Sequence, residues 1–355
     1  MMRTLHVLDI PWWSALSAYA FCCMETEKKS GIESYLACPK NSLSFRKAKE
    51  NSLNIKTIHG RDILSAGLNF IKIGTICQNV KPDVIIVHTG SLHFITFIWS
   101  AIHRLPVIRT RIIAQTVNKN LLNKFLYKHT SRLIAPTEKI RRELIDKLSL
   151  DADKIQTLYF PAGVDDTTDV VLPGRKSVGM IGRLDPVKGH ATFLEAAANV
   201  QSKLEDVEFH IAGSEENIQW ETLEKMCRQL GLKNIFYHGF LSKDKLKSFI
   251  NNCSVGVVAS YDSEVVSRAT VEWMAAGRPV VATSVGCIPE ILDSEVGGYI
   301  VPTKDADAMA EKIIFLLGHN NTAEAMGKKN LDKAKTVLSR ENFENSWLSI
   351  LESVK

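Results

Sequence analysis

A chain of 355 residues is too long for one domain of ordinary size and suits two, each able to bury its own core. Hydrophobic residues make up 45% of the chain and charged residues 23%, a balance that excludes disordered and fibrous proteins. No run of 18 apolar residues exists, so no membrane-spanning helix is expected. The seven cysteines are scattered without a C-x-x-C pair, so neither a disulfide framework nor a zinc site is expected.

The net charge of +5 is distributed unevenly along the chain. Residues 1–165 carry 23 Lys and Arg against 13 Asp and Glu, whereas residues 166–355 carry 21 against 26. A basic first half fits an anionic partner such as a phosphorylated substrate, anionic lipid headgroups or nucleic acid. A solvated basic surface without any partner explains the charge equally well.

In the first half, short runs rich in Val and Ile alternate with segments of helical period. The predicted strands include Leu5–Ile10, Val84–His88, Pro106–Thr110 and Leu133–Pro136, and the predicted helices include Trp13–Lys29, Leu121–His129 and Thr137–Leu148. The segment Phe160–Lys176 is rich in Pro, Gly, Asp and Thr and lacks periodicity. We therefore expect it to join a domain of residues 1–165 to a domain of residues 166–355.

The second half repeats the alternation more clearly. Its predicted strands are Val178–Gly182, Val207–Ala212, Ile235–His238, Val255–Ala259, Val280–Thr283 and Tyr299–Val301. Its predicted helices are Ala191–Lys203, Gln219–Leu230, Lys243–Asn251, Arg268–Ala276 and Asp307–Leu317. Strands that are apolar on both faces, alternating with helices, indicate parallel sheets covered on both sides. The predicted fold is thus α/β, with two Rossmann-like domains, an interdomain cleft at the carboxyl ends of their strands, and a last helix able to pack back on the first domain.

One loop carries most of the predicted chemistry. Residues 182–189, Gly-Arg-Leu-Asp-Pro-Val-Lys-Gly, directly follow a predicted strand. Gly182 has no Cβ, so a ligand can approach the backbone closely at the end of that strand. Arg183 and Lys188 place two cations in one strand-to-helix loop, where they can neutralise the charge that grows on a departing diphosphate. A loop whose Arg and Lys are merely solvated is the alternative.

A second group of residues surrounds the start of the helix that follows residue 267. Ser267 is expected to cap this helix, and the amides of Val265, Val266 and Ser267 would form an anion site at its positive end. Glu264, in the loop before the helix, can accept hydrogen bonds from sugar hydroxyls. Glu272, predicted to be buried within the helix, can bridge the two hydroxyls of a ribose. The placement of the two glutamates around a helix start, after a strand, makes the pair informative.

In this order the motifs resemble the donor domain of the retaining family 4 glycosyltransferases, which have the GT-B fold of two Rossmann-like domains. The resemblance rests on residues 182–189, on Glu264 with Glu272, and on residues 277–283 followed by 285–290. Residues 160–165, Phe-Pro-Ala-Gly-Val-Asp, are similar to the stretch that this family has at its domain junction. The resemblance is close over about residues 155–320 and loose over the first half.

The resemblance implies a role for each motif. Arg183 and Lys188 would hold the donor diphosphate, and Glu264 would contact the transferred sugar, so these three form the catalytic set. Residues 238–241 resemble the segment whose backbone flanks the nucleotide base. The donor-binding residues would be Gly182, Phe240, Val265, Val266, Ser267 and Glu272.

Three features depart from the family pattern. Many members have Gly-Phe-Gly after the first glutamate, where this chain has Val-Val-Ser, and β-branched residues resist positive φ angles. Trp13 and Ser14 stand in the first strand-to-helix loop where many members have a glycine pair; they would line the cleft or simply pack. Ile112 occupies the position of a histidine that many members place near the reacting sugar.

Other side chains of the first half are candidates for the role of that histidine. Arg109 and Arg111 are expected to contact phosphate or acceptor. His88 and His93 are substitute candidates, although a histidine at the end of a strand is more often structural. With Trp13 and Ser14, three of these residues, His88, Arg109 and Arg111, complete the predicted acceptor-side set.

No general base is identifiable, which fits the family's retaining chemistry, in which the departing phosphate helps to deprotonate the acceptor. Asp151 with Asp153 and Asp305 with Asp307 imitate metal-binding D-x-D motifs. Both pairs are interpreted as turn or helix-start residues, so no metal is expected. No cofactor is expected either, the substrate being a UDP- or GDP-linked sugar.

The predicted function is that of a metal-independent hexosyltransferase that serves cell-surface polysaccharide or lipopolysaccharide biosynthesis. Its partners would be the nucleotide-sugar donor and a glycan or lipid-linked acceptor, not nucleic acid. We expect a cytoplasmic protein, peripheral on the inner face of the membrane. The segment Leu121–Arg132 interleaves apolar and basic residues and would either contact the membrane or pack as an ordinary helix.

Two alternatives stay open at this point. Ile112 and the missing glycine pair support a catalytically degenerate protein that binds nucleotide sugars without turnover. A sugar-nucleotide epimerase would have a similar two-domain fold, but the first half has few of the acidic and basic side chains that it needs at the sugar. A nicotinamide dehydrogenase is not expected, because no G-x-G-x-x-G follows the first strand.

Overall fold

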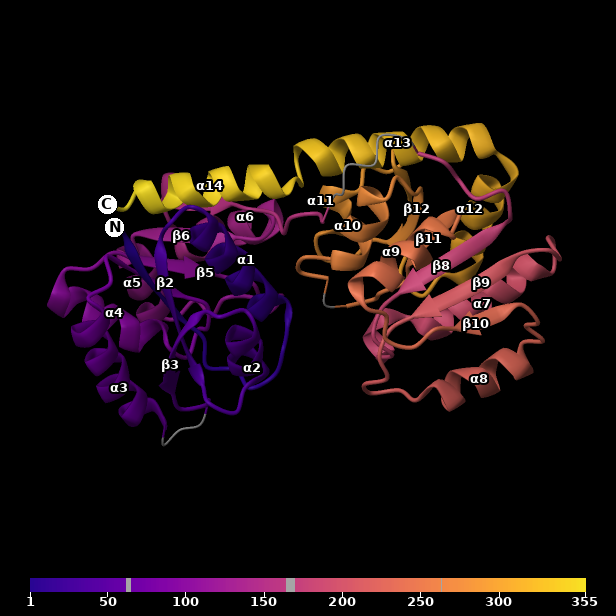
Figure 1. Cartoon of the computed structure of the whole chain (residues 1–355). Helices are drawn as coiled ribbons and strands as arrows, with labels where there is room; N and C mark the ends of the chain where they lie inside the picture. The colour runs from indigo at the N-terminus through magenta and orange to yellow at the C-terminus, as the bar shows by residue number, and fades with distance from the viewer. Residues whose placement is uncertain (62–64, 164–169, 263) are drawn as a thin grey trace. The chain divides into compact units, whose positions relative to one another are not determined.

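The computed structural model describes residues 1–61, 65–163, 170–262 and 264–355, which form two compact units (Figure 1). Unit 1 consists of Met1–Phe160 together with Phe343–Lys355, and unit 2 consists of Pro161–Asn342. Val164 and Asp165, the last two residues of the predicted junction motif, lie outside the described residues, as does Ser263.

Unit 1 is built on a seven-stranded parallel sheet in the order β3-β2-β1-β4-β5-β6-β7. The strands are β1 Arg3–Val7, β2 Glu33–Pro39, β3 Asn54–Ile58, β4 Val84–Val87, β5 Val107–Thr110, β6 Arg132–Ala135 and β7 Ile155–Thr157. The helices are α1 Ala15–Lys29, α2 Leu43–Glu50, α3 Ser65–Val80, α4 His93–His103, α5 Leu121–His129, α6 Glu138–Leu148 and, from the end of the chain, α14 Arg340–Glu352. Every residue of β4 and β5 is buried, as expected for strands that helices cover on both faces.

Helix α14 joins the core of unit 1 although it lies more than 300 residues from α1 in sequence. Trp347 is fully buried and donates through Nε1 to Oε1 of Glu27 in α1 at 2.9 Å. Lys29 forms an ion pair with Glu344 at 2.7 Å at the surface of the same contact. Burial of an indole together with its hydrogen bond anchors the C-terminal segment to this unit.

Unit 2 is built on a six-stranded parallel sheet in the order β10-β9-β8-β11-β12-β13. The strands are β8 Ser177–Ile181, β9 Glu208–Ala212, β10 Ile235–Tyr237, β11 Val255–Val258, β12 Val280–Thr283 and β13 Gly298–Val301. The helices are α7 His190–Gln201, α8 Trp220–Gln229, α9 Lys243–Asn251, α10 Arg268–Ala275, α11 Ile288–Ile291, α12 Ala306–Gly318 and α13 Asn320–Thr336.

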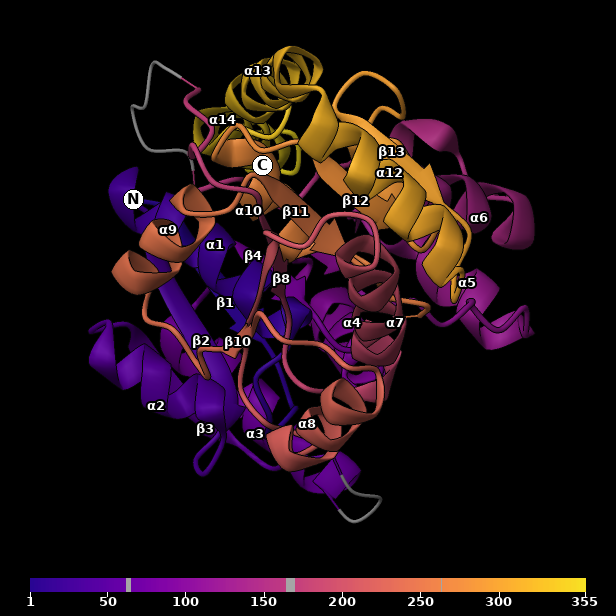
Figure 2. The same ribbon diagram turned by 90° about the vertical axis from the view of Figure 1, so that its right-hand side faces the viewer.

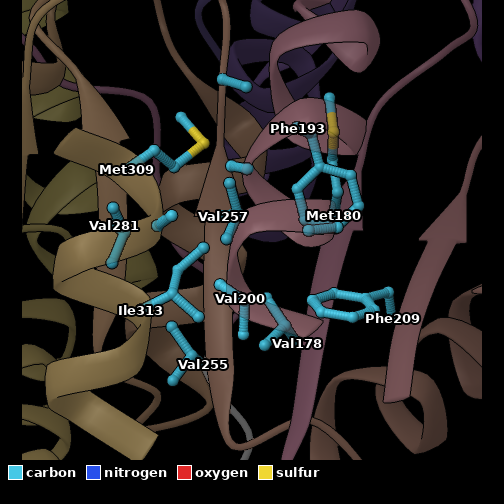
Figure 3. Packing of buried hydrophobic residues seen from close by; sticks show 14 of the residues in the cluster. Val178, Met180, Phe193, Val200, Phe209, Val255, Val257, Val281, Met309 and Ile313 are labelled. Atoms are coloured by element: carbon cyan, nitrogen blue, oxygen red, sulfur yellow. The ribbon is translucent and has the colours of Figure 1, made fainter. Parts of the chain in front are cut away.

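The core of unit 2 shows why its first strand is sandwiched between helices. Met180 of β8 lies next to Phe193 of α7, and Met309 of α12 lies next to Val281 of β12 in the same core (Figure 3). Figure 2 shows α7 and α12 on one side of the strands and α9 and α10 on the other. Alternate residues of one strand therefore enter different layers, which requires both faces to be apolar.

On the opposite face, two glycines admit a large side chain. A Cβ at Gly179 in β8 or at Gly256 in β11 would lie 2.6 Å and 2.3 Å, respectively, from ring atoms of Trp273. Trp273, in α10, is fully buried. The glycines thus bring α10 close to the sheet, with the start of the helix at the carboxyl ends of β8 and β11.

Both sheets confirm the predicted α/β fold with two Rossmann-like halves. In each sheet the strand order reverses beside the first strand, between β1 and β4 in unit 1 and between β8 and β11 in unit 2. Loops that leave two such neighbouring strands diverge to opposite faces and leave a crevice, which is where open α/β sheets bind ligands.

Candidate functional site

An ammonium–carboxylate pair occupies the crevice of unit 2. Lys188 ends a short 3-10 helix, Pro186–Lys188, after β8, and its Nζ lies 2.6 Å from Oε1 of Glu264, which follows β11. Ser260 donates through its hydroxyl to the same oxygen at 2.6 Å. The Glu264 side chain is 6% exposed and that of Lys188 22%, so the cation is the part of the pair that a ligand can reach. The structure therefore brings together two of the three residues predicted to be catalytic.

Asp185 organises the loop that holds the two predicted cations. Its carboxylate accepts hydrogen bonds from the Val187 amide at 3.1 Å and from Nδ2 of Asn217 at 2.7 Å, and it pairs with Nη2 of Arg183 at 3.2 Å. Burial alone would raise the pKa of Asp185, but these hydrogen bonds and the nearby Arg183 and Lys188 lower it below the usual value. The ion pair with Asp185 thus positions the Arg183 guanidinium, while the Arg183 side chain, 47% exposed, stays accessible to solvent.

Close backbone approach joins the two loops. Gly189 has φ +75°, and a Cβ there would lie 2.0 Å from the carbonyl oxygen of Ala259. Gly286 has φ +59°, and a Cβ there would lie 1.9 Å from the carbonyl oxygen of Glu264. Both positions therefore require glycine, since a side chain would push the loop that carries Glu264 out of place. At Gly182 a Cβ would meet only the Lys188 side chain at 3.7 Å, so packing within the chain does not require glycine there.

The residues after Glu264 present backbone amides beside the pair. Within the described part of the chain, no protein acceptor is found for the amides of Val265, Val266 and Ser267. The positive φ falls on Ser267, at +26°, and not on either valine, which removes the conflict expected for β-branched residues. Ser267 stands at the N-cap of α10, but its hydroxyl contacts the Thr270 hydroxyl at 2.8 Å and makes no capping bond. The predicted side-chain cap was wrong.

The two remaining predicted donor-binding residues differ in burial. The Glu272 side chain is partly buried, with 26% of it exposed, and its Oε1 lies 3.4 Å from Nη2 of Arg268, one turn earlier. Partial burial raises the pKa of Glu272, against the opposing effect of Arg268. Phe240 is 80% exposed and follows Gly239, whose carbonyl accepts from the Gly213 amide at 2.8 Å.

The sequence prediction missed several residues that build this site. Asp185, Asn217 and Ser260 set the positions of Arg183 and Glu264, yet each belongs to a residue type that is common in loops. Of the three, only Asp185 could have been recognised from the sequence, because an Asp side chain often accepts a hydrogen bond from the backbone amide two residues later and so caps a turn. His190 begins α7 beside this loop, and burial lowers its pKa to about 4.

In unit 1 the predicted acceptor-side arginines are buried. Arg109 is 3% exposed and donates through Nη1 to the Val87 carbonyl at 3.0 Å, and burial lowers its pKa. Arg111 is 6% exposed and donates through Nη2 to the Gln115 carbonyl at 2.5 Å. Ile112, at the position of the family histidine, is 5% exposed. Both arginine side chains are therefore buried and bonded to backbone carbonyls. Neither guanidinium is exposed to a ligand, as contact with phosphate or acceptor would require.

His88 is closed off from any ligand. It is fully buried, its Nε2 is hydrogen-bonded to Nδ1 of His6 at 2.9 Å, and its Nδ1 is hydrogen-bonded to the Thr110 hydroxyl at 2.7 Å. Burial, with further effects of His6 and Arg109, holds the pKa of His88 well below its usual value. His93 is also buried, with Nε2 hydrogen-bonded to the Thr130 hydroxyl at 2.9 Å. The prediction that His88 acts at the acceptor is therefore corrected to a structural role.

Trp13 and Ser14 lie in the loop before α1. The Trp13 ring packs edge-on against Phe21 at 5.0 Å between centroids, and Nζ of Lys47 lies 4.1 Å from the Trp13 centroid. Ser14 is the N-cap of α1 but makes no side-chain capping bond. The ring thus has a packing role, whereas the Ser14 hydroxyl stays half-buried.

A group of unsatisfied polar atoms lies at the crevice of the unit 1 sheet. Within the described residues, Asp9 Oδ1, Thr89 Oγ1 and Arg109 Nε are buried without a hydrogen-bond partner. Ser91 donates to the other carboxylate oxygen of Asp9 at 2.5 Å. Asp9 follows β1 and Thr89 follows β4, the two strands at which the order reverses. Unsatisfied buried polar groups are costly, and a ligand would satisfy them.

Both D-x-D motifs serve as caps. Asp151 accepts from the Asp153 amide at 3.0 Å, and Asp305 accepts from the Ala308 amide at 2.9 Å at the start of α12. Among the described residues, no group of three or more His, Cys, Asp or Glu is arranged to hold a metal ion. Over the same residues, no helix combines the length and the hydrophobicity needed to cross a bilayer.

Two parallel sheets whose strand order reverses beside the first strand, one with a lysine–glutamate pair in the loops at the reversal, define an α/β protein of the GT-B kind. Two family profiles match the chain: Glycosyltransferase Family 4 over residues 27–167 and Glycosyl transferases group 1 over residues 170–333. The chain belongs to the retaining family 4 glycosyltransferases.

Individual proteins agree with this assignment. The poly(ribitol-phosphate) alpha-N-acetylglucosaminyltransferase of Staphylococcus aureus is 28% identical over 180 residues, which cover 50% of this chain and 36% of that protein. Matches to two other curated relatives span 65% and 51% of their lengths, so the chain spans less than two thirds of each of these three relatives.

Solved structures show the same fold over the whole chain. A glycosyltransferase from Rickettsia africae superposes with a TM-score of 0.86 at 15% identity, covering 99% of this chain and 98% of that one. The Anabaena protein HepE, solved in complex with UDP and glucose, superposes with a TM-score of 0.78 at 16% identity, covering 99% and 100%.

Proposed function

We propose that this chain transfers a sugar, with retention of configuration, from a nucleotide-diphosphate donor to a glycan or lipid-linked saccharide acceptor in the synthesis of a cell-surface polysaccharide or lipopolysaccharide. The observation that carries the proposal is the Lys188–Glu264 pair in the unit 2 crevice, beside the open Arg183 guanidinium. Cations on one side of a crevice and a carboxylate on the other suit a ligand that carries a diphosphate at one end and hydroxyls at the other.

The donor diphosphate is assigned to Lys188 and Arg183. A carboxylate as buried as that of Glu264 would repel a diphosphate, but the ammonium 2.6 Å away offsets its charge. The amides of Val265, Val266 and Ser267 add uncharged donors at the start of α10, where the helix dipole favours an anion. Glu264 itself accepts hydrogen bonds from the hydroxyls of the sugar.

Transfer then requires one bond to break and one to form on the same face of the sugar. The bond between C1 and the phosphate oxygen breaks, and the electron pair stays on the diphosphate. Lys188 and Arg183 stabilise this new charge, and such stabilisation is commonly the largest contribution to catalysis of this kind. The acceptor oxygen bonds to C1 and its proton passes to the departing phosphate, so no side-chain base is needed.

The acceptor is assigned to unit 1. The unpartnered atoms Asp9 Oδ1 and Thr89 Oγ1 follow β1 and β4 at its switch point and offer both an acceptor and a donor to a polyhydroxyl ligand. The relative in Staphylococcus aureus, named for transfer to poly(ribitol-phosphate), supports a polymeric acceptor. The UDP and glucose bound to HepE support a UDP-linked donor.

The test is a panel of UDP- and GDP-linked sugars incubated with the protein with no metal added. A transferase releases free nucleotide diphosphate, slowly with water and faster with an acceptor. Conversion into a new sugar nucleotide would identify an epimerase instead. Binding without release would identify the degenerate protein, which the buried Ile112 at the family histidine position favours.

Glu272→Ala is expected to raise the donor dissociation constant about tenfold, because a hydrogen bond to a charged group contributes about 1.5 kcal/mol or more. Turnover at saturating donor should change little, since the ribose contact is the same before and after bond breaking. Calorimetric titration with nucleotide diphosphate measures the change, and Glu195→Ala, at an exposed position of α7, is the control. An unaltered dissociation constant would rule out the ribose contact.

A further inference from the structure

An extended part of unit 1 is almost free of acidic residues. Residues 65–137 contain nine Lys and Arg but a single acidic residue, Asp83, which accepts from the Arg3 amide at 2.7 Å. Arg109 and Arg111 are buried, whereas Arg104, Lys119, Lys124 and Lys128 are exposed on and around α4 and α5. The exposed charge of this region is therefore positive.

The same region exposes large apolar side chains on three neighbouring helices. Of 15 large hydrophobic residues exposed within the described chain, seven lie on α3, α4 and α5: Leu68, Ile71, Phe94, Ile102, Leu121, Leu122 and Phe125. Helix α4 packs against both α3 and α5, and the three follow one another along the left side of unit 1 in Figure 1. We name this surface, with its lysines, the α3–α5 face. Grouped exposed apolar residues mark an interaction site, whereas single ones do not.

We propose that the α3–α5 face binds the headgroup region of a lipid bilayer that contains anionic lipids. Leu121 is 85% exposed and Leu122 50%, and Lys124 and Lys128 follow on the same short helix. Exposed apolar side chains next to lysines suit the surface of a bilayer. The apolar side chains enter the outer part of the acyl-chain region, while the lysine ammonium groups stay among the lipid phosphates. An absence of acidic residues is what an anionic surface demands, and it distinguishes this face from the mixed-charge rim of a typical protein interface.

This inference does not depend on the proposed function, although a bilayer beside unit 1 would bring a lipid-linked acceptor to it. The sequence pattern indicated α5 alone. The structure adds Leu68 and Ile71 from α3 and Phe94 and Ile102 from α4, so that the contact extends over three helices.

The test is co-sedimentation of the full chain with vesicles of phosphatidylcholine, alone or mixed equally with phosphatidylglycerol. We expect binding to the mixed vesicles, weakened by salt because the lysines are screened. Lys124→Glu with Lys128→Glu should weaken it roughly twenty-fold or more, since each lysine near an anionic surface contributes about fivefold. The control pair Lys225→Glu with Lys328→Glu changes the net charge equally on exposed positions of α8 and α13 and should weaken binding far less.

The apolar contribution has its own variants. Ile71→Ser with Leu121→Ser removes two exposed side chains and should weaken binding to mixed vesicles, whereas Val296→Ser with Val337→Ser, at exposed positions of unit 2, should not. Release of nucleotide diphosphate without vesicles should be the same in all four variants, so failure here is distinct from failure of the proposed function. Absence of vesicle binding, equal binding to neutral vesicles, or equal loss in the control pairs would overturn the proposal. So would loss of self-association in the α5 variants, because the face would then bind a second copy of this chain.

Discussion

Lys188→Ala is expected to lower kcat by a factor of about a hundred or more, as is Arg183→Ala, because each removes a cation that stabilises the departing diphosphate. Lys188 is the more critical of the two, since its Nζ lies 2.6 Å from Oε1 of Glu264, the residue assigned to the transferred sugar. The rate of nucleotide diphosphate release at saturating donor measures the effect. Lys225→Ala, at an exposed position of α8, is the control and should keep full turnover.

A second variant separates catalysis from folding. Lys188→Ala leaves the nearly buried Glu264 carboxylate without its partner, which is itself destabilising. Adding Glu264→Gln removes that unpaired charge and keeps a side chain of the same shape. We expect the double variant to regain thermal stability but not turnover. Unchanged turnover in both the Arg183 and the Lys188 single variants would contradict the roles assigned to them.

Glu27→Ala is expected to lower the free energy of unfolding by about 3–5 kcal/mol, the usual cost of breaking a buried charge network by removing one partner. The Glu27 carboxylate is fully buried and accepts from the Thr4 hydroxyl at 2.6 Å, from Nε2 of His6 at 3.0 Å and from Nε1 of Trp347 at 2.9 Å. It also accepts from the Ser34 hydroxyl. Its removal would leave donors from β1, β2 and α14 unsatisfied. Urea unfolding measures the loss, with Glu25→Ala, exposed on the same helix, as the control.

The same network makes stability depend on pH. Burial alone would raise the pKa of Glu27, but His6 and the hydrogen bonds from Ser34 and Thr4 lower it overall. A carboxyl whose folded pKa is lowered stabilises the fold above its unfolded pKa, and this contribution is lost as the pH falls through the folded value. We therefore expect the unfolding free energy of the wild type to drop on acidification more steeply than that of Glu27→Ala. Parallel pH profiles would show that Glu27 is not the titrating group.

The second half of the fold was predictable because its buried strands are short, apolar and regularly spaced. Predicted Val280–Thr283 and Lys243–Asn251 agree with β12 and α9 at both ends. The predicted set did not include β2, β3 or β7, nor α2, α3, α4, α11 and α13, and it gave the last helix, α14, without bounds. Strand β3, Asn54–Ile58, lies at the edge of the sheet and is only partly buried, so it lacks the apolar run that marks an inner strand.

The donor side of the site was predictable in its residues and not in its contacts. Lys188 and Glu264 were both chosen, but their pairing depends on β8 and β11 lying side by side, which follows from strand order and not from spacing along the chain. Asp185 and Ser260 act through the loops that they hold, and of these two only Asp185, as a turn cap, carried a signal in the sequence. In unit 1, Arg109 and His88 were predicted to contact a ligand because they are polar residues at or near the ends of apolar strands. The structure shows instead that their partners are inside the sheet layers.

The measurement that tests the account most directly is a crystal structure of the chain with the nucleotide sugar that the donor panel selects. The account predicts phosphate oxygens within hydrogen-bonding distance of Nζ of Lys188 and of the Arg183 guanidinium, with the sugar against Glu264. A donor whose diphosphate is bound elsewhere, away from both cations, would contradict it.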